Sequence, residues 1–430
     1  MGDKGKDTLV EWVKMRNNGK NEGLAVIQII PRNIHFPPSG GDAVRVHSQS
    51  RAVAKNGCRV NIICFAARSD EQRVDLPNVL LYPIAGEVTV ISSQQRFRRD
   101  FSILRILRDF SLFFVQAFLF VRREGRDPCV MHAHTPEGGM IALGLKFLTG
   151  KPFIYDPHDW HFEKWILVYV DVSLFSRKIL SFAYRILASV VPRVADVTIA
   201  VSESMSRCIP HARLRQIVPN AIDPNHIQTL RRTMPKQAPG SMKRIVFAGS
   251  IAKHQGLKLL LDAFSNVCSH RSDVELWIIG SGEYLSSCKL LARKLRISNK
   301  IRFLGRHPQN DTLKMVAQAD VCVAPFLPES FCMTSCPIKI LEYAALGKKI
   351  VTTNLPFIRD LLGDYQVAFL SQPNQVELTQ KLLQALEFEP PDSARNEKGD
   401  LSFSIDRFTD NFVATTLMKL YRAVLAQAVQ

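Results

Sequence analysis

Short apolar runs that alternate with helical patterns constrain the fold of this 430-residue chain more than any other feature. In the first half, apolar runs predict strands at 24–30, 58–65, 79–84, 129–133 and 152–155, with helices at 42–55 and 137–148. The alternation starts again with strands at 244–248, 274–279, 301–304, 321–324 and 349–352, and with helices that begin at Leu257, Glu283, Asp311 and Ile338. Such strands joined by helices form parallel βαβ units. We therefore predict an α/β fold with two Rossmann-like, doubly wound domains that face each other across a cleft.

The length of the chain exceeds what one hydrophobic core usually supports, which also favours two domains. Residues 1–22 are polar and charged, so we expect a tail or a loose first helix there. Residues 23–225 hold the first set of strands, and 243–407 hold the second. Between them, residues 226–242 are rich in Arg, Pro and Gln and indicate a linker. Residues 408–428 have the pattern of a final amphipathic helix.

A formal net charge of +17 predicts an anionic partner. No zinc-finger spacing, RNA-binding motif or long basic run accompanies the charge, which argues against nucleic acid. Residues 96–126 carry eight arginines around an apolar, aromatic middle. Basic ends with such a middle are typical of a helix that lies in the headgroup layer of an anionic membrane. The alternative is a buried core helix over 111–121 with solvated arginines at its ends. Residues 166–192, which also combine apolar and basic residues, are a second candidate for a membrane-associated helix.

Several features bear on the compartment. No run approaches the roughly twenty apolar residues that span a bilayer. The first residues lack the apolar core of a signal peptide, and nine cysteines contain no CxxC pair. We expect a cytoplasmic protein that associates peripherally with a membrane.

Polar residues cluster after two neighbouring strands of the first half. His132 and His134 end one strand, while Asp156, His158 and Asp159 follow the next. Ligands of open α/β sheets gather at these carboxyl ends. Zinc binding is one interpretation, because His and Asp are suitable zinc ligands. Another is that His132 is simply a histidine of the protein interior. We favour sugar binding without a metal, because HExxH and other recognisable ligand spacings are absent.

Glycine turns follow strands in both halves. Gly40 and Gly41 follow the first strand, and paired glycines let the backbone approach a bound group closely. The alternative is a tight turn without a ligand. In the second half, Gly249 and Ser250 follow a strand, with Lys253 close by to supply charge for a diphosphate. Backbone groups at two further strand ends, near Gly282 and Arg306, can line a binding site for a nucleobase.

The segment 335–353 combines a helix start with a carboxylate. Pro337 opens the predicted helix, Glu342 lies within it and Gly347 ends it. The N–H groups at a helix start can hold a phosphate, and the carboxylate can accept hydrogen bonds from ribose hydroxyls. The alternative is an ordinary surface glutamate on an α/β helix.

Taken together, these residues resemble the GT-B glycosyltransferases, specifically family 4 of retaining, nucleotide-sugar-dependent enzymes, over roughly residues 24–425. The resemblance is carried by the motifs above, together with Val218-Pro-Asn220-Ala-Ile-Asp223 and Cys336-Pro-Ile-Lys339-Ile-Leu-Glu342. It implies that the last helix, 408–430, crosses back to the first domain. Glu342 would bind the donor ribose, and His134, with Asp156, would lie near the transferred sugar. His132, His158 and Asp159 would line the acceptor side.

The resemblance also implies how the donor diphosphate is held. The implied donor-binding residues are Gly40, Gly41, Gly249, Ser250, Lys253, Gly282, Arg306, Ser335, Pro337, Ile338, Lys339 and Glu342. The chain departs from the family at three places. Ser250 and Gln255 stand where the family usually carries cations, and Ser335 stands where many members carry a second glutamate. A branch with Ser-x-Pro-x-Lys before the glutamate is more similar to this chain.

The sequence therefore predicts a glycosyltransferase that moves a sugar from a UDP- or GDP-linked donor to a saccharide or lipid-linked acceptor, with retention and without a cofactor. The missing cations leave a non-catalytic subunit of a partner transferase as an alternative. A sugar-nucleotide epimerase or a phosphorylase of similar fold is another.

Overall fold

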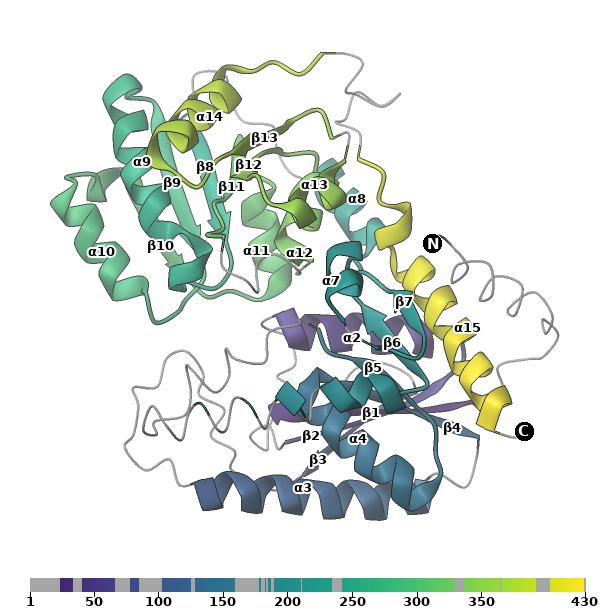
Figure 1. Cartoon of the computed structure of the whole chain (residues 1–430). Coiled ribbons are helices and arrows are strands. Elements are labelled where there is room, and N and C mark those ends of the chain that lie inside the picture. The colour runs from purple at the N-terminus through teal and green to yellow at the C-terminus, as the bar shows by residue number, and fades with distance from the viewer. Residues whose placement is uncertain are drawn as a thin grey trace.

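The computed structural model describes residues 24–33, 41–65, 78–84, 103–124, 128–158, 178, 182, 185–186, 189–209, 211–233, 242–328, 336–363, 365–391 and 403–428. These residues form two parallel sheets, each with helices on both faces (Figure 1). The predicted pair of Rossmann-like domains is therefore confirmed.

The first sheet has the strand order β3-β2-β1-β4-β5-β6-β7, and its pairs are parallel. Its strands are β1 (Ala25–Asn33), β2 (Arg59–Phe65), β3 (Val79–Ile84), β4 (Cys129–His134), β5 (Phe153–Asp156), β6 (Val197–Ala200) and β7 (Arg215–Ile217). Val26 and Ile30 of β1 pack with residues of α2 (Gly41–Ala54) and α15 (Asp410–Ala428). Ile27 and Ile29 face α3 (Ile103–Glu124) and α4 (Thr135–Thr149) on the other side. Burial on both faces explains why β1 is an almost continuous apolar run.

The second sheet repeats this plan with the order β10-β9-β8-β11-β12-β13. Its strands are β8 (Lys243–Ala248), β9 (Val274–Ile279), β10 (Ile301–Gly305), β11 (Val321–Ala324), β12 (Lys349–Thr353) and β13 (Ala368–Ser371). One face packs on α9 (Leu257–His270), α10 (Leu285–Lys294) and α14 (Gln375–Glu387). The other packs on α8 (Pro224–Thr233), α11 (Gln309–Val316), α12 (Ile338–Ala345) and α13 (Pro356–Leu362).

The start of the expected linker is a helix. Residues 224–233 form α8, and Ile227 and Leu230 are buried in the same cluster as Leu346. Only these two residues of α8 are buried, one turn apart. Because the rest of the helix is polar, its composition was typical of a linker and did not indicate a packed helix. Residues 234–241 of that range lie outside the described residues.

The described part of the basic element is α3, at the edge of the first domain farthest from the second (Figure 1), whereas residues 96–102 and 125–126 lie outside the described residues. Phe113, Ala117 and Val121 follow the four-residue spacing of one helix face and are buried against the sheet. The opposite side exposes Leu112, Val115 and Leu119 at 43%, 52% and 59%. The helix is thus a core helix on one side and an open apolar surface on the other. Among the described residues, no helix has both the length and the apolarity needed to cross a bilayer.

Two segments of chain connect the domains and run side by side. The amide of Ile222 donates to the carbonyl of Phe408 at 2.8 Å, and Ile222 pairs with Thr409. Beyond this point α15 packs along α2 of the first domain (Figure 1). Tyr421 of α15 is consequently buried beside the end of β4.

Candidate functional site

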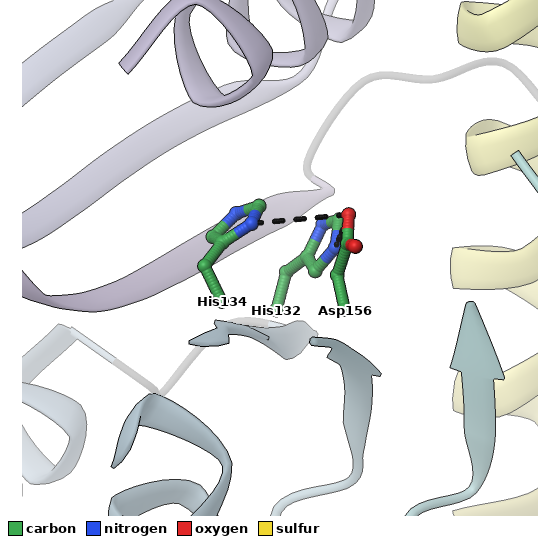
Figure 2. A group of neighbouring side chains, drawn as sticks. All are labelled: His132, His134 and Asp156. Atoms are coloured by element: carbon green, nitrogen blue, oxygen red, sulfur yellow. Dashed lines mark ion pairs between the residues drawn. The ribbon is translucent and has the colours of Figure 1, made fainter. Parts of the chain in front are cut away.

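Three fully buried side chains meet at the ends of two adjacent strands (Figure 2). β4 ends with His132 and His134, and the parallel register sets His134 opposite Asp156 of β5. Asp156 Oδ2 lies 3.7 Å from His132 Nε2 and 3.9 Å from His134 Nδ1. The structure therefore brings together the polar strand ends expected from the sequence.

Arg45 of α2 neutralises the buried carboxylate. Its Nε and Nη2 lie 2.9 and 2.8 Å from Asp156 Oδ2, and Gln49 Nε2 donates to the same oxygen at 3.1 Å. Burial alone would raise the pKa of Asp156, but Arg45 and the neighbouring histidines hold this pKa well below its usual range. Asp156 is therefore a carboxylate at neutral pH.

The two histidines have different partners. His132 Nδ1 lies 2.7 Å from the Tyr421 hydroxyl, whereas His134 Nδ1 lies 2.9 Å from His158 Nε2. His158 in turn contacts Asp42 Oδ1 at 3.0 Å. Burial lowers the pKa of both His132 and His134, so both rings are neutral at pH 7. His134 is fully buried, and within the described residues its Nε2 has no hydrogen-bond partner.

His132, His134 and Asp156 also offer three atoms that could hold a metal, all within 4.8 Å of one another. Two His and one carboxylate suit several transition metals. However, the guanidinium of Arg45 already contacts the carboxylate oxygen and would repel a divalent cation. The charges favour an ion pair at this position, and the absence of a metal stays a prediction.

On the donor side, a lysine from α12 reaches the glycine turn after β8. Gly249 has a positive φ of 143°, which favours glycine, and a Cβ atom added there would lie 2.6 Å from Lys339 Nζ, so the amine lies directly against this turn. Lys339 Nζ donates to Gln255 Oε1 at 2.7 Å. The amine also lies 4.3 Å from the ring centroid of Phe247 and 5.2 Å from that of Phe326.

Glu342 lies on α12, three residues beyond Lys339. Gln309, at the start of α11, donates to Glu342 Oε1 at 2.7 Å. Burial raises the pKa of Glu342, although the Gln309 bond and the Lys339 charge oppose this. Pro337 precedes the helix and makes no side-chain cap, so no capping side chain competes for the first-turn N–H groups of α12.

The other predicted donor-binding residues differ in their exposure and packing. Ser250, Lys253 and Arg306 are exposed. Gly282 packs closely, since a Cβ there would lie 2.3 Å from the Ile251 carbonyl oxygen. Gly41 is the exposed first residue of α2, whereas Pro337 and Ile338 are partly buried at the start of α12. The predicted residues Gly40, Asp159 and Ser335 lie outside the described part of the chain.

Sequence reasoning missed several residues of this site: Arg45, Gln49, Tyr421, Gln309 and the contact of Gln255 with Lys339. The two residues on α2 carried a detectable signal. Arg45 and Gln49 lie four residues apart on a helix that begins just after the Gly40-Gly41 turn. No spacing in the sequence relates Tyr421 to His132, because 289 residues separate them.

Two family models match the chain over most of its length. The model "Glycosyltransferase Family 4" matches residues 39–226, and the model "Glycosyl transferases group 1" matches residues 232–400. Among curated proteins, a D-inositol 3-phosphate glycosyltransferase of Corynebacterium urealyticum is 23% identical over 74% of this chain and 75% of its own. A phosphatidyl-myo-inositol mannosyltransferase of Mycobacterium tuberculosis is 26% identical over 48% of this chain and 53% of its own.

Solved structures agree in fold. Sucrose-phosphate synthase from Thermosynechococcus elongatus superposes with a TM-score of 0.72 at 16% identity, covering 94% of this chain and all of that one (100%). Anabaena HepE, solved in complex with UDP, gives a TM-score of 0.64 at 15% identity, with 93% and 100% coverage. At these identities the likeness concerns the fold.

Proposed function

The chain belongs to the family 4 glycosyltransferases of the GT-B fold, and we propose that it transfers a sugar from a nucleoside diphosphate sugar, UDP- or GDP-linked, to a saccharide or lipid-linked acceptor. The proposal includes retention of the anomeric configuration and needs no cofactor. The observation that carries it is the placement of Lys339 at the Gly249 turn, one helical turn from Glu342.

This placement puts a cation directly at the glycine turn of the donor site. Ser250 and Gln255 are neutral, but the Lys339 amine lies where a diphosphate beside Gly249 would meet it. Glu342 supplies a carboxylate for the ribose, and the start of α12 supplies backbone N–H groups for phosphate oxygens. Negative charge develops on the diphosphate as the sugar leaves, so a fixed cation at this point stabilises the transition state.

On the first domain, the His134 and Asp156 cluster would face the transferred sugar and the acceptor. His134 is neutral and has one ring nitrogen without a described partner, so it can hydrogen-bond a sugar hydroxyl. Asp156, held by Arg45, lies within 4 Å of a ring nitrogen of each of these histidines. The catalytic roles of His134, Asp156 and Glu342, and the acceptor-side roles of His132, His158 and Asp159, are part of this proposal.

The relatives support an anionic acceptor and donor. The matched curated proteins are named for inositol 3-phosphate and for phosphatidyl-myo-inositol, and HepE has been solved with UDP. A headgroup phosphate also fits the net charge of +17.

The donor proposal is tested by calorimetric titration of the folded protein with UDP-, GDP- and ADP-sugars, with and without a divalent cation. We expect saturable binding of one nucleotide class that does not depend on the cation. A correctly folded protein that binds none of these donors would contradict the proposal and favour a non-catalytic subunit.

We also propose that α3 rests on an anionic membrane. Leu112, Val115 and Leu119 form the exposed apolar row, and Arg122 and Arg123 are exposed at the end of the helix. Arginines near an anionic surface contribute about 1 kcal/mol each. Replacing Arg122 and Arg123 with glutamine should therefore weaken binding to phosphatidylserine-containing vesicles by roughly tenfold or more.

A vesicle co-sedimentation assay checks this expectation. Arg293 and Lys294, two adjacent basic residues in the last turn of α10, provide a matched control in the second domain. Their replacement with glutamine should leave vesicle binding close to that of the wild type. Equal losses in the two double variants would indicate a general charge effect and would remove α3 as the contact.

A further inference from the structure

One asparagine joins the buried cluster of the first domain to the donor helix of the second. Asn220 follows β7, in the segment that leads from one domain to the other. Its Oδ1 accepts from Arg45 Nη1 at 2.9 Å, and its Nδ2 donates to the carbonyl oxygen of Cys336 at 2.6 Å. Cys336 immediately precedes Pro337 and α12. A continuous set of bonds therefore runs from Asp156 through Arg45 and Asn220 to the start of α12.

The chemistry of the two neighbours fixes the orientation of this amide. A guanidinium has only donors, and a carbonyl oxygen has only lone pairs. The oxygen of Asn220 must therefore face Arg45, while the NH2 group must face Cys336, so rotating the amide by half a turn would break both bonds. Arg45 is itself held by Asp156 and by the Val218 carbonyl at 3.0 Å, and it is 2% exposed. Asn220 is thus attached to a fixed point of the first domain.

The Asn220 bonds lie beside the point where the two connecting segments meet. The two connecting segments meet two residues away, at Ile222 and Phe408. On another side of Cys336, a pocket of about 440 Å³ is lined by Pro219, Phe357 and Phe408, so the junction is not filled by side chains there. A link beside the crossing point of both segments can persist while the domains rotate about it.

We propose that Asn220 is a positioning residue that acts as the pivot between the domains and transmits occupancy of the donor site to the Arg45–Asp156 pair. The inference rests on the proposed function, because it requires a nucleotide that binds beside α12. Such a ligand orders the start of α12, and Asn220 carries this ordering through Arg45 to α2.

Hydrogen exchange measured by mass spectrometry tests the link without an acceptor. The probe is whichever of UDP, GDP and ADP binds the wild-type protein. In the wild type we expect the nucleotide to slow exchange in the α12 peptide and, by at least about fivefold, in the α2 peptide. In Asn220→Asp, the carboxylate keeps Arg45 but repels the Cys336 carbonyl, so protection of α12 should remain while protection of α2 is lost.

Two further variants make the result specific. Gln375→Ala removes another side-chain amide that donates to a backbone carbonyl, that of Asp262, away from α2 and α12, and should behave like the wild type. Asn220→Ser, which is too short to bridge both partners, should reproduce the loss and replaces Asn220→Asp if that variant does not fold. Nucleotide protection of α2 that persists in the Asn220 variants, or that is missing in the wild type, overturns the inference. A wild-type protein whose α12 is not protected by any of the three nucleotides instead contradicts the proposed function.

Discussion

Replacing Lys339 with methionine should weaken binding of the nucleoside diphosphate by about 10- to 100-fold, because charge-assisted hydrogen bonds contribute about 1.5–3 kcal/mol each. Methionine keeps an unbranched apolar stem against Phe247 and Phe326 while removing the charge. The loss should therefore reflect the amine at the Gly249 turn and not a packing defect. Calorimetric Kd values for wild type and variant measure it directly.

Lys253 provides the matched control. It lies in the same turn region and is closer along the chain to Gly249, but its side chain is exposed. Lys253→Met should change Kd by less than about threefold, as expected for a charge in high dielectric. If Lys253→Met had the larger effect, the diphosphate would lie outside the turn, and the proposed role of Lys339 would be wrong.

This pair of lysines shows what the sequence could not resolve at the donor site. Proximity along the chain favours Lys253, which belongs to the same strand-turn-helix unit as Gly249. The amine that reaches the turn comes instead from α12, 90 positions later, because β11 adjoins β8 in the sheet and α12 packs over that junction. Contacts of this kind depend on strand order, which spacing in one sequence does not define.

The fold was more predictable than the site. The limits of β9 and β11 agree with the apolar runs, because strands buried on both faces leave a continuous signal. The limits of β3 agree as well, although it is an edge strand on which Leu80 is 51% exposed. The strands β6, β7 and β13, of three or four residues each, were not predicted, although β5 and β11 have four residues and were. In the site, the ends of β4 and β5 were recognisable because parallel strands end at one edge of the sheet. The pairing of Arg45 with Asp156 was not, since 111 residues separate the two.

Replacing Glu342 with alanine should lower donor affinity and turnover at least about tenfold, because a carboxylate that accepts from ribose hydroxyls contributes about 1.5–3 kcal/mol per bond. The same residue predicts a pH dependence. Burial raises the pKa of Glu342 above its usual 4.5, and only the ionised form is a full acceptor. Donor binding favours the carboxylate, so affinity is complete above this raised pKa and is lost as the pH falls through it.

Glu342→Gln separates this effect from the titration of the ligand phosphates. The amide cannot ionise. The variant should therefore bind the donor more weakly at pH 7, but it should not lose donor affinity through protonation of residue 342 as the pH falls. Comparing wild type and variant at each pH cancels the protonation of the nucleotide itself. A variant whose affinity falls with pH as steeply as that of the wild type would show that another group causes the loss.

Inorganic pyrophosphate distinguishes the roles of the two residues of α12, because it keeps the diphosphate and lacks the ribose. Lys339→Met should weaken both pyrophosphate and the nucleoside diphosphate, whereas Glu342→Ala should weaken only the nucleoside diphosphate. Glu342 could also act indirectly, since its charge lowers the free energy of the nearby Lys339 ammonium. In that case removing the carboxylate would change pyrophosphate binding too, so an unchanged pyrophosphate Kd in Glu342→Ala would assign the carboxylate to the ribose.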